Sequence, residues 1–374
     1  MTSQRPSVLV VTVVHHPQDA RIRHRQVPAL LAAGWDVTYA APFRGYDLPV
    51  PPDATHGAGR LHCVDVPRAT GRRRLRALRD ARRLVRGLGR AHDVVLVHDP
   101  ELLLAVPRSL RPRAVWDVHE DTAAAVVAKP WLPRPARAVA AGLVRRAERW
   151  AERRLTLLLA EYGYRKRFTR EHVVVPNTVP VPADAPVPGT DRAVYLGSIT
   201  LERGALEVVE TGRLLRERTA GALTTHVVGP AHGPAEALVR EAHERGDVHW
   251  HGFVPNDRAG ELLDGALAGL SLLQDLPNYR HSMPTKVLEY MAHGVPVVTT
   301  PLPLARDVVT TAGSGVVVPF ADPAAAADAV LALRAAPGRA ADLGAAGRRA
   351  ARERYDWATV SDDFVAALRG AARR

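Results

Sequence analysis

Short valine-rich runs alternate with helical patterns along the first half of the chain. Four of these runs are residues 8–14, 37–41, 93–97 and 114–118. Between the first two, residues 20–33 show a helical pattern, with Asp19 as a plausible N-cap and Gly34 as a C-terminal stop. Strands that are apolar almost throughout and separated by helices predict a parallel sheet covered on both faces.

The alternation stops at a proline-rich stretch and then starts again. Residues 176–192, "PNTVPVPADAPVPGTDR", hold five prolines, which disfavour both helix and sheet and therefore predict an interdomain linker. Further strand-like runs follow at 193–197, 225–229, 248–252, 270–274, 295–300 and 315–319. The pattern predicts an α/β protein with two doubly wound, Rossmann-like domains, 1–180 and 190–355, that face each other across a cleft. Residues 344–372 read as helical and arginine-rich.

The positive charge is unevenly distributed. The chain carries a net charge of +12, yet residues 1–185 hold 31 Lys and Arg against 17 Asp and Glu, while residues 186–374 hold 20 against 22. This asymmetry favours contact between the first domain and a polyanion or an anionic surface. A plainer explanation is GC-rich coding, because 48 of the 51 positive residues are Arg.

One segment concentrates this charge. Residues 71–90 carry nine arginines and one aspartate, and Leu75, Leu78, Val85 and Leu88 recur at near-helical spacing. The segment therefore predicts either a basic amphipathic helix that binds anionic membrane, or a helix docked on the sheet with a solvated arginine face. Aromatic residues are too sparse among the arginines to favour nucleic-acid binding.

Several classes of protein are disfavoured by composition. Cys63 is the only cysteine, so no disulfide framework is expected, as in a cytosolic protein. No run of about 18 apolar residues occurs, so the sequence predicts no membrane span. Residues 8–14 lack the flanking residues of a signal peptide. We therefore expect a cytoplasmic protein, at most peripheral at the inner face of the membrane.

In the first predicted domain, strands end in histidines. Residues 8–14 lead into His15 and His16, and the strands at 93–97 and 114–118 lead into His98 and His119. Acidic residues follow the last two: Asp99, Glu120 and Asp121. A parallel sheet directs such groups to one crevice, where histidine can bond a sugar hydroxyl or move a proton. An alternative is chance, since the chain has 16 histidines, and the spacing does not suggest zinc.

In the second predicted domain, strands end in glycine: Gly197 before Ser198, Gly229, and Gly252 before Phe253. Glycine lets a ligand approach the backbone closely. Neither G-x-G-x-x-G nor a P-loop occurs, and no Asp-x-Asp suggests a metal–diphosphate site. We expect no metal and no cofactor.

The stretch 278–300, "NYRHSMPTKVLEYMAHGVPVVTT", predicts a short helix that Ser282 caps and Gly294 ends. Its first turn offers unpaired N–H groups and the positive end of the helix dipole. Lys286 lies in that turn, and Arg203 likewise lies at a predicted helix start. Two cations at helix starts favour a bound diphosphate; the alternative for each is a solvated surface charge.

Seven stretches together resemble the bacterial family 4 retaining glycosyltransferases of the GT-B fold. In chain order they are "HHPQDARIRHRQVPALLAAGWDVT", "VHDPELL", "WDVHED", "AKPWLP", "YLGSITLERG", "HGFVP" and "PTKVLEYMAHGVPVVTT". The resemblance implies a UDP-, GDP- or dTDP-sugar donor held by the second domain and an acceptor held mainly by the first. It also implies a C-terminal helix, about 356–374, that crosses back to the first domain.

The resemblance assigns residues by position. Glu289 matches the second glutamate of the family's E-x7-E motif, which bonds the donor ribose, and Arg203 and Lys286 would hold the diphosphate. His98, with His119 and Glu120, would serve catalysis beside the transferred sugar. The other donor-side candidates are Gly197, Ser198, Gly229, Gly252, Phe253, His281, Ser282 and Thr285. The acceptor-side candidates are His15, His16, Asp19 and Arg21.

Two departures from the family pattern concern the donor. The first glutamate of E-x7-E falls at His281, and Ser198 stands where the family often has arginine.

The expected reaction is metal-independent sugar transfer with retention, to a hydroxyl of a glycan, a lipid-linked acceptor or a natural product. A nucleotide-sugar 2-epimerase using Asp99, Glu101 or Glu120, and a non-enzymatic polyanion-binding protein, are the alternatives.

Overall fold

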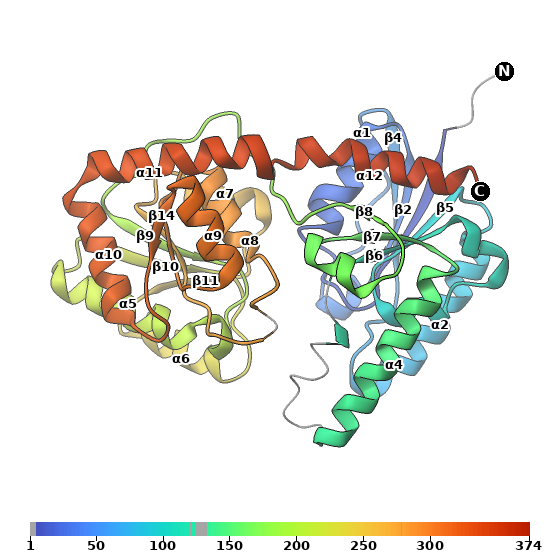
Figure 1. Ribbon diagram of the computed structural model, residues 1–374, viewed down its shortest axis with the longest axis horizontal. Helices are drawn as coiled ribbons and strands as arrows, with labels where there is room; N and C mark the ends of the chain where they lie inside the picture. The colour runs from blue at the N-terminus through green and yellow to red at the C-terminus, as the bar shows by residue number, and fades with distance from the viewer. Residues whose placement is uncertain (1–4, 120–121, 124–132, 278) are drawn as a thin grey trace. The chain divides into compact units, whose positions relative to one another are not determined.

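The computed structural model describes residues 5–119, 122–123, 133–277 and 279–374. It divides into two compact units, Met1–Asn177 with Val360–Arg374, and Thr178–Thr359. The chain therefore passes between the units twice, once after Asn177 and once within the last helix (Figure 1). Among the described residues, no helix is both long enough and apolar enough to cross a membrane.

Unit 1 is built on an eight-stranded sheet of order β3-β4-β2-β1-β5-β6-β7-β8. Every neighbouring pair is parallel except β3 and β4. The strands are β1 (Ser7–Val11), β2 (Asp36–Ala41), β3 (Ala54–His56), β4 (Gly59–Asp65), β5 (Val94–Val97), β6 (Ala114–Val118), β7 (Thr156–Leu159) and β8 (Val173–Val174). The central strands β5 and β6 are buried along their whole length, which explains their continuous apolar runs.

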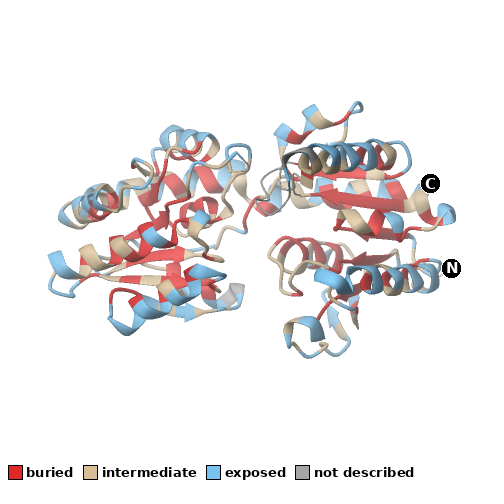
Figure 2. Ribbon diagram, turned by 90° about the horizontal axis from the view of Figure 1, so that it is seen from below, coloured by how far each residue is buried: buried red, intermediate tan, exposed pale blue. Residues whose placement is uncertain are grey.

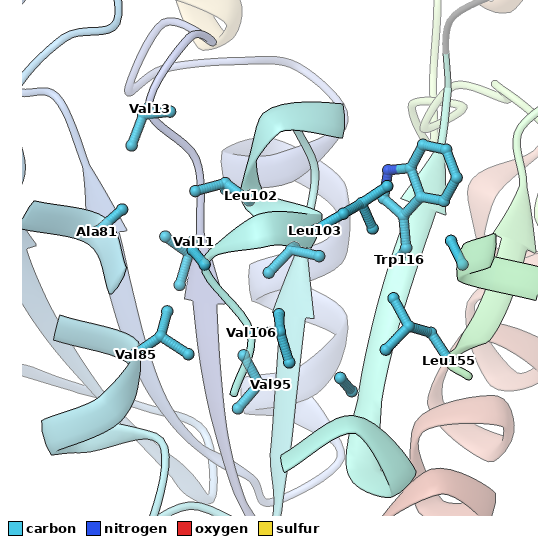
Figure 3. Packing of buried hydrophobic residues seen from close by; sticks show 14 of the residues in the cluster. Val11, Val13, Ala81, Val85, Val95, Leu102, Leu103, Val106, Trp116 and Leu155 are labelled. Carbon is cyan, nitrogen blue, oxygen red and sulfur yellow. The ribbon is translucent and has the colours of Figure 1, made fainter. Parts of the chain in front are cut away.

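The helices of unit 1 are α1 (Val27–Ala32), α2 (Arg74–Leu88) and α4 (Arg134–Glu152), with short 3-10 helices η4 (Pro100–Leu104) and η5 (Arg108–Arg113) between β5 and β6. α2 packs through Ala77, Ala81 and Val85, one stripe at four-residue spacing. Figure 3 shows Ala81 and Val85 beside Val11 of β1 and Val95 of β5. The sheet therefore covers one face of α2 and leaves its arginines outward.

The segment predicted as a helix over 20–33 is more complex than its periodicity indicates. Residues Ile22–Gln26 form a π turn, and α1 starts only at Val27. Pro28 explains the irregularity, because it has no N–H to donate to the turn before it. Asp19 does accept hydrogen bonds from the N–H groups of Arg21 and Ile22 at 2.9 and 3.0 Å, so it begins this segment as expected.

Unit 2 contains a six-stranded, fully parallel sheet of order β11-β10-β9-β12-β13-β14. The strands are β9 (Arg192–Leu196), β10 (Thr224–Val228), β11 (His249–Gly252), β12 (Ala268–Ser271), β13 (Val297–Thr299) and β14 (Gly315–Val317). The helices are α5 (Ala205–Arg218), α6 (Pro234–Glu244), α7 (Asn256–Leu263), α8 (Thr285–Ala292), α9 (Pro303–Ala312), α10 (Pro323–Ala335) and α11 (Pro337–Ala350). The last helix, α12 (Trp357–Ala372), begins in unit 2 and belongs to unit 1 from Val360 onward. In each unit the central strands are buried and the helices turn exposed faces outward, while the edge strands β3, β8 and β11 are partly exposed (Figure 2).

The two parallel sheets confirm the predicted fold class of doubly wound α/β units. The proline-rich stretch begins at the unit boundary but is not free beyond it. Arg348 Nη2 donates to the carbonyls of Pro182 and Ala183 at 2.8 Å, and Val179 is buried. Residues 178–190 are therefore a strap bound to unit 2.

Candidate functional site

The histidines predicted at strand ends do come together in unit 1. β1, β5 and β6 are neighbours, and their carboxyl ends place His15, His98 and His119 in one cluster. His119 Nε2 lies 2.9 Å from His15 Nε2, and the His98 and His119 ring centroids are 5.6 Å apart. Asp99 Oδ1 lies 3.3 Å from His15 Nε2, and the other carboxylate oxygen, Oδ2, accepts from the Val13 N–H at 2.6 Å.

A buried ion pair underlies this cluster. Arg21 donates through Nε and Nη2 to the two carboxylate oxygens of Asp117 at 2.7 and 2.8 Å, and Gln26 adds a bond of 2.6 Å. Burial alone would raise the pKa of Asp117, but Arg21 holds that pKa well below its ordinary value. Arg21 also donates to Asn177 and to the Val175 carbonyl, so its side chain is engaged within unit 1 rather than open to a ligand.

His98 is the buried member of the cluster. Its Nδ1 lies 3.4 Å from Asp117 Oδ2 but outside hydrogen-bond geometry, and neither ring nitrogen has a hydrogen-bond partner among the described residues. A cavity of about 10 Å³, room for one water, adjoins it between His15, Pro100 and Thr122. His98 is thus held in place by burial, and both of its ring nitrogens can still form hydrogen bonds.

His119 is neutral at physiological pH. Burial, and next the neighbouring His15, lower the pKa of His119 to about 3. The two close ring nitrogens then share one N–H, so one ring donates to the other. Such a pair can pass a proton without ever holding two positive charges.

The remaining acceptor-side candidates are more peripheral. His16 lies edge-on to the Tyr46 ring, and its Nδ1 accepts from the Gln18 N–H. Burial lowers the pKa of His16 as well. Asp19 lies 3.9 Å from His15 Nδ1. Glu120 and Asp121 lie outside the described residues.

His98, Asp117 and His119 place three ligand atoms within 4.8 Å of one another, which raises the question of a cation. Both oxygens of Asp117 already accept from Arg21, whose guanidinium supplies the positive charge there. A divalent ion would have to displace that contact and lie beside Arg21. The donor set therefore fits a histidine–carboxylate network better than a metal site.

In unit 2, the three strand-end glycines lie side by side. The Gly197 N–H donates to the Val228 carbonyl at 2.8 Å, and the Gly229 N–H donates to the Gly252 carbonyl at 2.8 Å. A β-carbon on Gly229, where φ is 143°, would lie 2.2 Å from the Gly197 carbonyl oxygen. Gly229 is thus required by the close approach of the strands, whereas a β-carbon on Gly197 or Gly252 would meet open space and only their positive φ favours glycine. Together the three glycines leave the sheet edge bare.

Lys286 is the most unusual group of unit 2. Its side chain is buried in the first turn of α8, with Nζ 3.4 Å from the centroid of the Tyr195 ring. Nζ has no hydrogen-bond partner among the described residues. Burial, and then the charge of Arg203, hold the pKa of Lys286 well below its ordinary value. A cation in this position is costly unless an anion joins it.

Arg203 approaches from the neighbouring loop. Thr200 Oγ1 accepts from the Arg203 N–H at 3.3 Å, and Arg203 Nη1 donates to the Ser198 carbonyl at 3.3 Å. Tyr195 donates to the same carbonyl through its hydroxyl. Gly204 then turns the chain into α5 at a φ of 87°, where a β-carbon would lie 2.1 Å from the Leu272 carbonyl oxygen. The loop is fixed, so Arg203 and Lys286 remain neighbours.

The start of α8 differs from the prediction. The helix begins at Thr285 with Pro284 at the N-cap position, and no side chain caps it, so Ser282 is not the cap. Pro284 fixes its own φ and ends the preceding turn, which places the helix start two residues later than expected. The N–H groups at the start of the helix are therefore those of Thr285 and Lys286, and no side chain caps them. Glu289 follows one turn on and is half-buried, whereas His281 and Phe253 are exposed.

Tyr290 positions α8, and sequence reasoning missed it. Its hydroxyl accepts from the Leu196 N–H at 2.9 Å and donates to the Leu270 carbonyl at 3.0 Å, which ties α8 to β9 and β12. A β-carbon on Gly269 would lie 2.3 Å from the Tyr290 ring. The strand there, β12, covers 268–271 rather than the predicted 270–274. The sequence carries no local signal for the contact, because Gly269 and Tyr290 lie in different elements of the chain.

Comparison with known proteins adds a family and a fold. Residues 190–335 match the family described as glycosyl transferases group 1. No curated protein matches the sequence. The structure is similar to sucrose-phosphate synthase from Thermosynechococcus elongatus, with a TM-score of 0.69, 18% identity, and coverage of 98% of this chain and 99% of that one.

Two further solved structures are similar over nearly their whole length. WaaG, a glycosyltransferase involved in lipopolysaccharide biosynthesis, has a TM-score of 0.67 at 17% identity, with coverage of 96% of this chain and 98% of that one. HepE from Anabaena, in complex with UDP and glucose, has a TM-score of 0.67 at 12% identity, with coverage of 98% and 99%. At such identities the likeness shows a shared fold.

Proposed function

We propose that this chain, a group 1 glycosyltransferase with the GT-B-like fold, transfers a sugar from a nucleoside-diphosphate sugar bound in unit 2 to a hydroxyl acceptor bound by unit 1. The family match over 190–335 bears out the predicted family and enzyme class. The observation that carries the donor assignment is Lys286: a buried ammonium without a hydrogen-bond partner among the described residues, beside Arg203 and at a helix start. A diphosphate would complete this site.

The donor is arranged along α8. Its diphosphate receives the Thr285 and Lys286 N–H groups together with the Lys286 and Arg203 side chains. Glu289, one turn deeper, accepts from the ribose 2′ and 3′ hydroxyls. The bare edge at Gly197, Gly229 and Gly252 admits the nucleotide close to the backbone. UDP is the first nucleotide to test, because the similar HepE structure contains it.

The chemistry is charge separation at the anomeric carbon. The bond from that carbon to the diphosphate oxygen breaks, and its electron pair leaves with the nucleoside diphosphate. The acceptor hydroxyl oxygen forms the new bond on the same face, and its proton passes to the departing phosphate oxygen. Lys286, Arg203 and the α8 dipole stabilise the negative charge that develops on the departing diphosphate. In other enzymes a metal ion can stabilise such a charge. We therefore propose transfer without a metal.

Residues of unit 1 are assigned to the acceptor and the transferred sugar. His98, rigidly seated with unused hydrogen-bonding capacity, would bond a hydroxyl of the transferred sugar. His15 and His119 would orient the acceptor hydroxyl, and the Arg21–Asp117 pair would hold the cluster in place. Arg21 is thus a positioning residue in this proposal, not an acceptor contact.

A transfer assay tests the proposal. Purified protein is incubated with UDP-, GDP- and dTDP-sugars and a panel of hydroxyl acceptors, and nucleoside diphosphate release and the product anomer are measured. We expect release that depends on acceptor, persists in EDTA and yields the retained anomer. Isomerised sugar from donor alone would point to the epimerase instead. Activity lost in EDTA and restored by Mn²⁺ would contradict the assignment of Arg203 and Lys286.

A further inference from the structure

A groove of about 830 Å³ opens on unit 1 between α2, the η4–η5 segment and α4. It is separate from the histidine cluster, although η4 follows directly on His98 and Asp99. α2 faces it with the stripe Leu75, Arg79, Arg82 and Arg86, which adjoins the stripe docked on the sheet. The groove is therefore lined by a face of α2 that does not pack against the sheet.

The groove carries positive charge without compensation. Five arginines line it: Arg79, Arg82, Arg86, Arg108 and Arg111. None of its lining residues is acidic, and within the described part of the chain none of the five forms an ion pair. The one acidic residue of α2, Asp80, pairs instead with Arg76 at 3.8 Å and Arg83 at 3.2 Å. On α2, the two arginines that pair with Asp80 therefore lie outside the groove lining, and three arginines without an ion pair among the described residues lie within it.

Arg111 shows how crowded these cations are. Its guanidinium lies 4.7 Å from the Trp150 ring centroid, and its buried Nε has no hydrogen-bond partner among the described residues. Burial, and then the neighbouring charges of Arg108 and Arg154, lower the pKa of Arg111. A group held like this gains by meeting an anion.

The same surface exposes large apolar side chains. Leu75 is 78% exposed and Leu104 is 66% exposed, and both line the groove. On α4, Val139 and Leu143 are 64% and 62% exposed, and they share a helical stripe with Trp150 at spacings of four and seven residues. The apolar lining of the groove therefore continues along the exposed face of α4.

We propose that this groove and the α4 stripe dock unit 1 on an anionic phospholipid bilayer. The arginines would bind headgroup phosphates, while Leu75, Leu104, Val139 and Leu143 enter the headgroup–acyl boundary. Nucleic acid would use the charge but leave the apolar side chains in water. This inference does not depend on the transfer reaction, because it concerns a different surface and is tested without a donor or acceptor.

The test is sedimentation of the full chain with vesicles of phosphatidylglycerol and phosphatidylcholine, or of phosphatidylcholine alone. We expect binding to the anionic vesicles only. The double variant Arg82→Gln/Arg86→Gln should bind roughly thirtyfold less tightly, since an arginine near such a surface contributes about fivefold. Its matched control is Arg76→Gln/Arg83→Gln, which removes the same charge from the same helix at the residues paired with Asp80, and which should retain most of the affinity.

A second pair of variants tests the apolar part. Leu75→Ser/Leu104→Ser changes exposed side chains, so folding should be retained, which circular dichroism checks. It should abolish the vesicle binding that remains in 0.5 M NaCl. The proposal is overturned if the wild type binds neither vesicle at low salt, if it binds both equally, or if both arginine pairs weaken binding equally. It is also overturned if the wild type binds a single-stranded RNA and the groove variants weaken that binding by the same factor as they weaken vesicle binding.

Discussion

At Lys286 the chain buries an ammonium group against the Tyr195 ring, at a helix start where its charge is disfavoured. The free protein therefore lowers the pKa of this lysine well below its ordinary value, through burial and the nearby Arg203. A bound diphosphate would act in the opposite direction and raise it. Nucleotide binding and proton uptake should then be coupled at this residue.

We predict that titrating UDP into the protein at mildly alkaline pH takes up protons. Calorimetry in buffers of different ionisation enthalpy measures the uptake directly. Lys286→Arg should abolish the uptake while keeping much of the affinity, because arginine stays charged. Proton uptake that is unchanged in Lys286→Arg would show that another group is responsible.

His119 makes a prediction for acid stability. Its pKa of about 3 in the folded state lies below the ordinary 6.5, so the unfolded chain binds a proton that the folded chain does not. Stability is then lost as pH falls from about 6.5 towards 3, by up to about 1.4 kcal/mol per pH unit for one proton. The depressed pKa of Asp117 acts later, because its contribution is lost only below its ordinary value of 3.8.

Urea unfolding at pH 7, 6 and 5 checks this. The free energy of unfolding of His119→Gln should fall less over this window than that of the wild type. His226, whose pKa is lowered to about 4 in unit 2, should contribute to the remaining dependence together with His16 and His251, whose pKa values burial also lowers. Parallel curves for the variant and the wild type would refute the assignment to His119.

At the scale of elements, α8 depends on one hydroxyl. Tyr290 bonds both the Leu196 N–H and the Leu270 carbonyl. We predict that Tyr290→Phe lowers the free energy of unfolding by about 1–3 kcal/mol, because two buried backbone groups lose their partner. UDP affinity should fall several-fold as the first turn of α8 loses its fixed position.

Tyr46→Phe in unit 1 is the matched control for that experiment. Its hydroxyl also donates to a backbone carbonyl, that of Val14, at 2.8 Å. It should reduce stability with no change in UDP affinity. Equal affinity in the two variants would remove Tyr290 from the donor site.

The elements themselves were largely predictable, since the strands of unit 2 are short runs rich in valine or other β-formers, most of them next to a glycine or proline. Four strands of unit 1, β3, β4, β7 and β8, were not predicted, and all lie away from the centre of the sheet. β3 and β8 are very short and β4 has a mixed pattern, whereas β7 is a short apolar run that directly follows a long helix. The helix starts at Val27 and Thr285 were displaced by Pro28 and Pro284, which override the periodicity.

The partners of the site residues were beyond sequence reasoning. Arg21 and Asp117 are 96 positions apart, and Leu196 and Tyr290 are 94 apart. Only the strand order brings each pair together. The histidine cluster was accessible because parallel strands end at one edge of a sheet, and the residue types at those ends were visible in the chain.

At the scale of the molecule, the chain forms two compact units that it connects twice, and we propose that each has its own function. Part of the excess charge of the first half lines the arginine groove. The Lys286 ammonium, which has no hydrogen-bond partner among the described residues, lies in the family-matched unit. The central claim concerns that second unit: α8 holds the diphosphate at its start and the ribose one turn deeper, at Glu289.

Calorimetric titration of Glu289→Gln with UDP, or with whichever nucleotide the wild type prefers, tests this claim most directly. The substitution keeps the shape and removes the charge that accepts from both ribose hydroxyls, so affinity should fall roughly ten- to a hundredfold. His98→Ala, in unit 1, is the control: it should leave nucleotide affinity unchanged while lowering turnover. Unchanged affinity in Glu289→Gln would contradict the donor site proposed for α8.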